Sequence, residues 1–289
     1  MMNGVSIIAP LTIDCIFTGV DRFPRDGEEI YSKDLKITLG GGANISACRL
    51  NNWNIPVKFG TFHSDSTLSK LALQECEAKK FPRIYNLYKG DKEPVILSVV
   101  YTGEKNRRII SYDPNVKENY LTDCELYDFL KNSRIATAPH NVNVVKKLHS
   151  DGTKLVYDVH CDDKLTLKAQ RDILEYVDVF TPNAAEAMSI AKTSNHQRAL
   201  EILCDYTAMP IVKLGEDGCC AKINGEILYF VAPKVDCIDT TGAGDNFLAG
   251  LIYGLYNGEK IEKCIAYANK AGAYSTTSYG CLGTDYKLD

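Results

Sequence analysis

Short apolar runs alternate with amphipathic stretches through the second half of the chain. Strands are predicted at residues 134–138, 154–159 and 177–181, and helices at 142–150 and 164–176. The first half begins in the same way, with predicted strands at 5–10 and 55–62 and a helix at 66–78. Such alternation is typical of a mainly parallel sheet covered by helices on both faces, so we expect an α/β fold of three αβα layers.

A second group of predicted strands does not alternate with helices. These strands lie at residues 12–17, 29–38 and 95–112, and the last of these ranges reads as a hairpin around a loop at 102–106. The strand at 29–38 could begin one residue earlier, at Glu28. We expect these segments to form a small separate sheet, a lid, within a single domain of residues 1–289.

Residues 239–252, with the sequence DTTGAGDNFLAGLI, follow an extended segment and lead into a predicted apolar helix at 247–256. The first N–H groups of a helix have no partner within it, and the helix dipole adds partial positive charge there. Gly242, Ala243 and Gly244 leave the backbone open to an anion. A carboxylate beside that anion, Asp245, suits a general base that takes a proton from an attacking hydroxyl.

This stretch resembles the second signature of the ribokinase-like (PfkB) carbohydrate kinases, and the resemblance extends over essentially the whole chain. It implies that Asp245 is the catalytic base and that residues 242–244 form the anion hole. Residues 40–44, Gly-Gly-Gly-Ala-Asn, resemble the first signature of the family. By that resemblance Gly41, Gly42 and Asn44 bind the sugar, although an Asn at a helix start can also be only an N-cap.

Asp14 follows the first predicted strand, at the edge where open α/β sheets bind ligands. The resemblance gives it a role in binding sugar hydroxyls, and the alternative is an ordinary turn residue. Ribokinases usually contact the sugar with a Glu near residues 138–141, but this chain has Ala-Pro-His-Asn there. The resemblance therefore does not single out ribose.

The nucleotide side is expected farther along the chain. Asn183 and Glu186 fall in the first turn of a predicted helix, where the acid could simply compensate the helix dipole. The resemblance instead implies that they organise phosphate and Mg²⁺, with Glu186 acting indirectly because Mg²⁺ keeps several water ligands. The turn at Gly215 and Gly218 would line the nucleotide pocket. Lys213, where related kinases commonly have Thr, could reach a phosphate or be exposed.

The resemblance also implies a possible K⁺ site at Asp239 and Thr241, and a possible homodimer formed through the lid sheet. ATP and Mg²⁺ are the expected cofactors, and a small sugar is the expected partner.

Composition agrees with a cytoplasmic enzyme. The 289 residues carry a net charge of −4, which gives no sign of a nucleic-acid surface. No apolar run approaches the ~18 residues of a membrane span, and the N-terminus lacks the basic region of a signal peptide. The eleven cysteines are odd in number and include no C-x-x-C pair, so we expect reduced, mostly buried thiols and no structural zinc site.

The leading hypothesis is an ATP-dependent sugar kinase that phosphorylates a primary hydroxyl of a ribose- or fructose-like acceptor. A nucleoside kinase of the adenosine or pseudouridine type is the alternative. It needs aromatic side chains that stack on the base, and Phe17, Tyr101 or Tyr112 could supply them. A non-catalytic sugar or nucleotide sensor would have no need of the base. Turnover of ATP with a panel of acceptors discriminates among the three.

Overall fold

The computed structural model describes residues 3–20, 22–102, 107–116, 120–159, 165–283 and 286–288. Its centre is a six-stranded sheet in the order β10-β9-β8-β1-β4-β5, in which every strand pair is parallel. The strands are β1 (Val5–Ile8), β4 (Val57–Thr61), β5 (Ile84–Asn86), β8 (Ile135–Thr137), β9 (Lys154–Tyr157) and β10 (Val179–Phe180). The strand order reverses on the two sides of β1, and ligands of open α/β sheets bind at the carboxyl ends near such a reversal.

An antiparallel unit continues this sheet beyond β10. It contains β11 (Ile211–Lys213), β12 (Cys219–Ile223) and β13 (Glu226–Phe230). Isolated parallel bridges, including one from Asn183 to Lys213, connect β11 to the β10 side. The carboxyl end of β11 therefore lies beside the carboxyl ends of the central strands.

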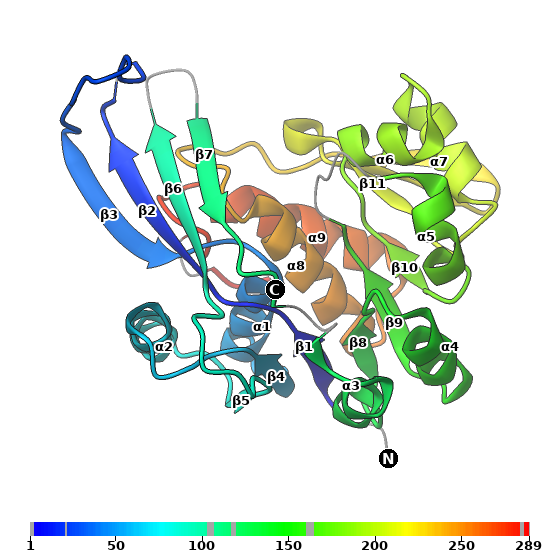
Figure 1. Ribbon diagram of the computed structural model, residues 1–289. Helices are drawn as coiled ribbons and strands as arrows, with labels where there is room; N and C mark the ends of the chain where they lie inside the picture. The colour runs from blue at the N-terminus through cyan, green and yellow to red at the C-terminus, as the bar shows by residue number, and fades with distance from the viewer. Residues whose placement is uncertain are drawn as a thin grey trace.

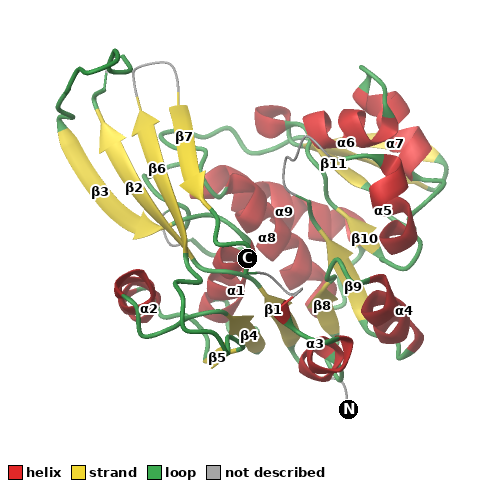
Figure 2. Ribbon diagram, in the orientation of Figure 1, coloured by secondary structure: helices red, strands yellow, loops and turns green. Residues whose placement is uncertain are grey.

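Helices cover both faces of the central sheet, as the alternating pattern predicted (Figures 1 and 2). One buried cluster includes apolar residues of α1 (Ala43–Asn52), α2 (Thr67–Ala78), α8 (Ala243–Tyr256) and α9 (Ile261–Ser275). The other includes residues of α3 (Asp123–Leu130), α4 (Val142–Ser150), α5 (Leu167–Leu174), α6 (Ala184–Ala191) and α7 (His196–Leu203). A Cβ atom on Gly250 would lie 2.5 Å from the carbonyl oxygen of Tyr267, so this glycine lets α8 pack closely on α9.

A four-stranded sheet stands apart from the central sheet and is the lid of this structure (Figure 1). Its order is β3-β2-β6-β7, with β3 (Asp34–Leu39), β2 (Thr12–Thr18), β6 (Ile96–Thr102) and β7 (Arg107–Tyr112). The β2–β6 pair is parallel and the other two pairs are antiparallel. Most of the predicted hairpin loop, residues 103–106, lies outside the described residues.

Several predicted boundaries were wrong. The strand expected from Glu28 or residue 29 begins only at Asp34, because Glu28 accepts bonds from the Arg22 side chain and the Arg25 amide in a loop. The lid strand predicted at 12–17 is confirmed as β2, and Asp14 therefore lies within the lid and not at the edge of the central sheet. Helix α8 begins at Ala243, four residues before the predicted start, because Gly242 adopts a left-handed conformation (φ 76°) as its N-cap.

Other sequence features are located as follows. Among the described residues, no helix is long and apolar enough to cross a membrane. Ten cysteines are free thiols within the described ranges, and six of these are buried. Burial raises the pKa of Cys219 to about 12, which makes that thiol unreactive at neutral pH. Cys161 lies outside the described residues.

Candidate active site

Two glycine-rich helix starts meet at one carboxylate. Asp245, in the first turn of α8, accepts a hydrogen bond through Oδ2 from the backbone N–H of Gly42, the N-cap of α1, at 2.8 Å. The Oγ of Ser46 donates to the backbone carbonyl of Asp245 at 2.7 Å. A Cβ atom on Gly41 would lie 3.0 Å from Oδ2 of Asp245. The two stretches singled out from the sequence therefore form one site.

The start of α8 is anchored from the C-terminal segment. A Cβ atom on Gly242 would lie 2.6 Å from the carbonyl oxygen of Cys281, so only glycine fits there. Asn246 donates through Nδ2 to the carbonyls of Gly242 (2.8 Å) and Cys281 (2.7 Å) and accepts from Nε of Arg49 (3.0 Å). Asn246 and Arg49 could not be predicted from the sequence, because a polar residue within an apolar helix run gives no sign of its distant partners.

Asn44 is fully buried near this carboxylate. Its Nδ2 donates a long bond of 3.4 Å to the carbonyl of Gly40, while its Oδ1 has no hydrogen-bond partner among the described residues. A Cβ atom on Gly42 would lie 2.9 Å from this Oδ1, so the oxygen lies beside the residue that binds Asp245. The N-cap interpretation of Asn44 was wrong, because Gly42 occupies the N-cap position.

Asp14 reaches the same region from the lid. It is only 5% exposed, and a Cβ atom on Gly40 would lie 2.4 Å from its Oδ1. Gly40 therefore leaves room for this carboxylate. The structure thus brings Asp14 next to the glycine loop that carries Gly41, Gly42 and Asn44.

Asn183 and Glu186 form a reciprocal capping box at the start of α6. Oδ1 of Asn183 accepts from the Glu186 N–H at 2.9 Å, and Oε2 of Glu186 accepts from the Asn183 N–H at 2.8 Å. This arrangement satisfies helix N–H groups. It explains both residues structurally, and it leaves Glu186 buried at the carboxyl end of β10.

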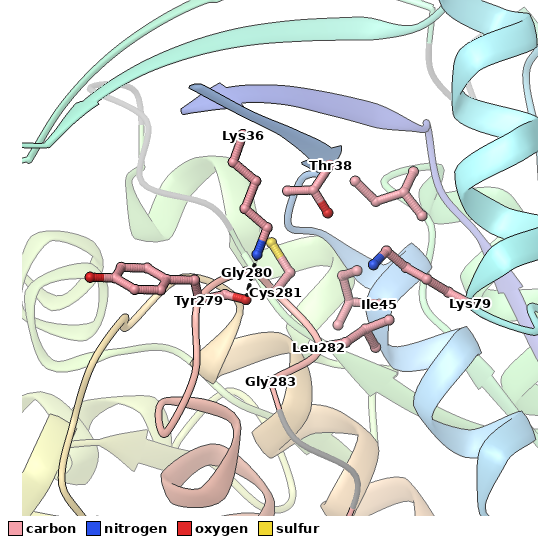
Figure 3. Close-up of a pocket in the computed structure, with 10 residues that line it drawn as sticks. Lys36, Thr38, Ile45, Lys79, Tyr279, Gly280, Cys281, Leu282 and Gly283 are labelled. Atoms are coloured by element: carbon pink, nitrogen blue, oxygen red, sulfur yellow. Dashed lines mark hydrogen bonds between the residues drawn. The ribbon is translucent and has the colours of Figure 1, made fainter. Parts of the chain in front are cut away.

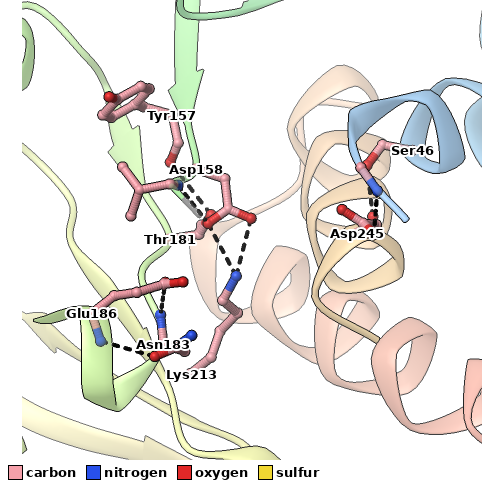
Figure 4. A network of polar contacts seen from close by, with 10 residues as sticks. Ser46, Tyr157, Asp158, Thr181, Asn183, Glu186, Lys213 and Asp245 are labelled. Carbon is pink, nitrogen blue, oxygen red and sulfur yellow. Dashed lines mark hydrogen bonds and ion pairs between the residues drawn. The ribbon is translucent and has the colours of Figure 1, made fainter. Parts of the chain in front are cut away.

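Lys213 forms an ion pair with Asp158, which follows β9. Its Nζ lies 3.0 Å from each carboxylate oxygen, and both side chains are only 14% exposed. A Cβ atom on Gly244 would lie 3.4 Å from the same Nζ, so the ammonium lies against the first turn of α8. Figure 4 shows Lys213 and Asp158 opposite Asp245. Asp158 was not among the predicted site residues, although its place directly after a parallel strand was a usable signal.

A cleft of about 570 Å³ opens beside Lys213. Its lining includes Asn183, Lys213, Gly215 and the side chains of His196 and Tyr229, whose Nε2 and hydroxyl lie 3.2 Å apart. Gly218 does not line this cleft. It adopts φ 94°, and a Cβ atom there would lie 2.0 Å from the carbonyl oxygen of Phe230.

Asp239 fixes the turn that leads into α8. Its Oδ1 accepts from the N–H (2.9 Å) and Oγ1 (2.6 Å) of Thr241, and its Oδ2 accepts from the Gly280 N–H at 3.0 Å. Next to Gly280, Nζ of Lys36 on β3 donates to the carbonyl of Tyr279 at 3.0 Å (Figure 3). The lid is thereby hydrogen-bonded to the segment that anchors α8.

Among the described residues, no group of three or more His, Cys, Asp or Glu side chains is arranged to hold a metal ion by itself. Any Mg²⁺ here would need phosphate and water oxygens as further ligands, which is the usual manner in which Mg²⁺ binds at phosphoryl-transfer sites.

Comparisons with known proteins found a matching family and related structures. Residues 2–286 match the sequence profile described as pfkB family carbohydrate kinase. The chain is 27% identical to a ribokinase of Lactococcus lactis over 99% of this chain and 95% of that protein.

Among solved structures, the chain resembles an Arabidopsis thaliana ribokinase complexed with ribose and ATP, with a TM-score of 0.81 and 22% identity, covering 98% of this chain and 95% of that one. It also resembles an adenosine kinase of Sinorhizobium meliloti, with a TM-score of 0.78 and 18% identity, covering 100% of this chain and 98% of that one. These structural likenesses show the ribokinase-like fold.

Proposed function

The chain belongs to the pfkB family of carbohydrate kinases, and from this premise we propose that it transfers the γ-phosphoryl group of ATP to a primary hydroxyl of a ribose- or fructose-like sugar. The observation that carries the proposal is the Asp245 carboxylate in the first turn of α8, hydrogen-bonded to the Gly42 amide of the opposing glycine loop. A carboxylate held beside an open helix N-terminus suits proton removal next to a bound phosphoryl group.

In this mechanism Asp245 accepts the proton of the attacking hydroxyl. The hydroxyl oxygen forms a bond to the γ-phosphorus while the bond from that phosphorus to the bridging oxygen breaks, and ADP leaves with that electron pair. The backbone N–H groups of Gly244 and Asp245 stabilise the charge on the transferred group, joined by that of Ala243 once it leaves its 3.2 Å bond to the Thr240 carbonyl. Positioning and electrostatics supply nearly all of the catalysis in this class of reaction.

Asn44 and Asp14 hold the acceptor. A buried carbonyl without a partner costs about 1–3 kcal/mol, and a sugar hydroxyl that donates to Oδ1 of Asn44 would recover that cost. Gly41 and Gly42 present backbone next to Asp245, where a side chain would intrude on the acceptor. Asp14 closes the site from the lid and accepts from a further hydroxyl.

The nucleotide occupies the cleft at the carboxyl ends of β10 and β11, lined by Asn183, Lys213 and Gly215. Gly218 shapes the turn of that cleft. Glu186 would hold Mg²⁺ through water, because its carboxylate already accepts a bond from the N-cap of its own helix. When bound, Mg²⁺ neutralises phosphate charge.

A monovalent cation such as K⁺ binds beside Asp239 and Thr241 in this proposal. The support is the fixed carboxylate of Asp239 in the turn that sets the start of α8. Replacing K⁺ by choline at constant ionic strength should then lower turnover, and equal rates in the two salts would refute the site.

Two copies of this single-domain kinase form a homodimer through their lid sheets in this proposal. Large apolar side chains on one face of the lid are exposed, namely Leu35, Ile37, Ile110 and Tyr112. Such a patch is typical of an interaction surface. Sedimentation analysis at several concentrations tests this, and a monomer at all of them would refute it.

A nucleoside kinase is the second candidate, and it needs an aromatic face on which a nucleobase can stack. The rings of Phe17 and Tyr101 on the lid stack with centroids 5.8 Å apart. Strand register puts these rings on the lid face of Leu35, opposite the face of Asp14, so they do not form a wall for a base bound beside Asp14 of the same lid.

The test is an assay of ADP release with MgATP and a panel of free sugars, phosphosugars and nucleosides. Saturable turnover on a pentose or ketose supports the proposal, and turnover on nucleosides alone makes the second candidate correct. Sugar binding without any ADP release across the panel would instead favour the sensor hypothesis. Asp236→Asn, at an exposed position in the preceding loop, is a matched control for changes at Asp245.

A further inference from the structure

Lys213 lies at a junction of three elements. It ends β11, its ammonium forms the bidentate pair with Asp158 after β9, and the same ammonium lies against Gly244 in the first turn of α8. The neighbouring residue Asp245 is the proposed base. The ammonium therefore lies beside the residue that precedes the proposed base, in addition to lining the nucleotide cleft.

We propose that Lys213 contacts the phosphoryl group during its transfer, and that Asp158 is a positioning residue that holds the ammonium against α8. This inference rests on the proposed function. An anion bound to the N–H groups at the start of α8 would lie next to Nζ of Lys213, so helix and ammonium would bind it from two sides (Figure 4). Lysine acts as a compact point charge toward phosphate, and charge-assisted bonds of this kind are strong.

The carboxylate of Asp158 explains how the ammonium keeps this place. A lysine side chain is long and flexible, and an exposed one would sample many positions. Here the two side chains are both largely buried, and two equal distances of 3.0 Å fix the ammonium. Because the ammonium is fixed before the phosphoryl group arrives, little reorganisation is needed during the reaction, which is the condition for efficient electrostatic catalysis.

The first test measures binding and needs no acceptor. Calorimetry with MgAMP-PNP and MgADP compares Lys213→Met, which removes the charge but keeps the length, with the wild type. A contact to the γ-phosphate predicts about 10–100-fold weaker binding of MgAMP-PNP, since a bond to a charged group contributes about 1.5–3 kcal/mol, with MgADP changed less than about threefold. Equal losses for both nucleotides, or no loss, would overturn the proposal.

The second test measures turnover with the acceptor found in the panel. Removal of one donor to a transition-state anion costs about 10²–10³-fold in kcat, so Lys213→Met should lower kcat by that factor while the KM of the sugar stays nearly constant. Lys222→Met on the neighbouring strand β12 is the matched control, since Lys222 is exposed. It should behave as wild type.

The role of Asp158 is tested by a double-mutant cycle. Asp158→Asn should lower kcat by about 10–100-fold, because an ammonium displaced by an ångström loses most of its effect. If Asp158 acts through Lys213, the double variant should be no slower than Lys213→Met alone. If the losses in kcat of the two single variants multiply in the double variant, the positioning role of Asp158 is refuted. If the variants have lower melting temperatures but an unchanged kcat, the ion pair between Lys213 and Asp158 is only structural.

The two hypotheses fail in distinguishable ways. If no sugar is phosphorylated but Lys213→Met selectively weakens MgAMP-PNP, the proposed acceptor class is wrong and the γ-phosphate contact remains. If a sugar is phosphorylated equally fast by wild type and Lys213→Met, the enzyme assignment stands and the role of Lys213 is refuted.

Discussion

Replacing Asp245 by Asn separates its chemical role from its structural one. The amide keeps an oxygen that can accept from the Gly42 N–H, now bonded at 2.8 Å, so the loop contact can persist. It cannot take a proton at neutral pH. Loss of a general base costs about 10²–10⁴-fold, and we expect kcat to fall within that range.

The structural cost of this change should be small. A charge-assisted hydrogen bond becomes a neutral one, which loses about 1 kcal/mol. Loss of a negative charge in the first turn of a helix adds about 0.3–1 kcal/mol. The sum, about 1–2 kcal/mol, corresponds to a decrease of roughly 2–3 °C in melting temperature for a chain of this size. That decrease leaves the variant folded at 25 °C.

The assay combines steady-state ADP release with calorimetric binding of the sugar and of MgAMP-PNP, using Asp236→Asn as the control. We expect both dissociation constants to stay within about threefold of wild type, since ground-state binding does not use the proton acceptor. A kcat within tenfold of wild type would refute Asp245 as the base. A decrease in melting temperature far beyond the range above would instead show that the carboxylate is mainly structural.

Three further changes test the start of α8, the acceptor site and the start of α3. Gly242→Ala should abolish turnover and lower the urea midpoint. Residue 242 has a φ of 76°, which disfavours alanine, and the alanine Cβ would lie 2.6 Å from the carbonyl oxygen of Cys281. Wild-type activity of this variant would contradict the tight contact. Asn44→Leu should raise the KM of the acceptor at least about tenfold without lowering the melting temperature. The change removes a buried oxygen that lacks a partner among the described residues. A destabilised variant with a normal KM would contradict this view. Bonding to Lys89 lowers the pKa of Glu125 from 4.5 to about 2, so the stabilising effect of its ionised form is present above pH 4.5 and lost as pH falls toward 2. The difference in urea midpoint between wild type and Glu125→Gln should shrink over that interval, and a constant difference would refute the assignment.

Much of the fold could be predicted because its causes are local. Periods of apolar residues specify α4 without error and the central strands to within a few residues, since each period directly reflects which face is buried. The two glycine-rich turns were identified for the same reason. Small residues before a helix expose its first N–H groups whatever the rest of the chain does. The start of β3 was misjudged, because a loop held by Arg22 and Glu28 can alternate like a strand.

The assembly of the site was decided only by tertiary structure. The Gly42 amide and the Asp245 carboxylate are 203 positions apart, and they meet because α1 and α8 pack on the same face of the sheet. Lys213 likewise reaches both Asp158 and Gly244 because three separate segments end at one edge. Local pattern fixes which residues can bind an anion or take a proton. Their mutual distances depend on how the layers pack, and no short stretch of sequence contains that information.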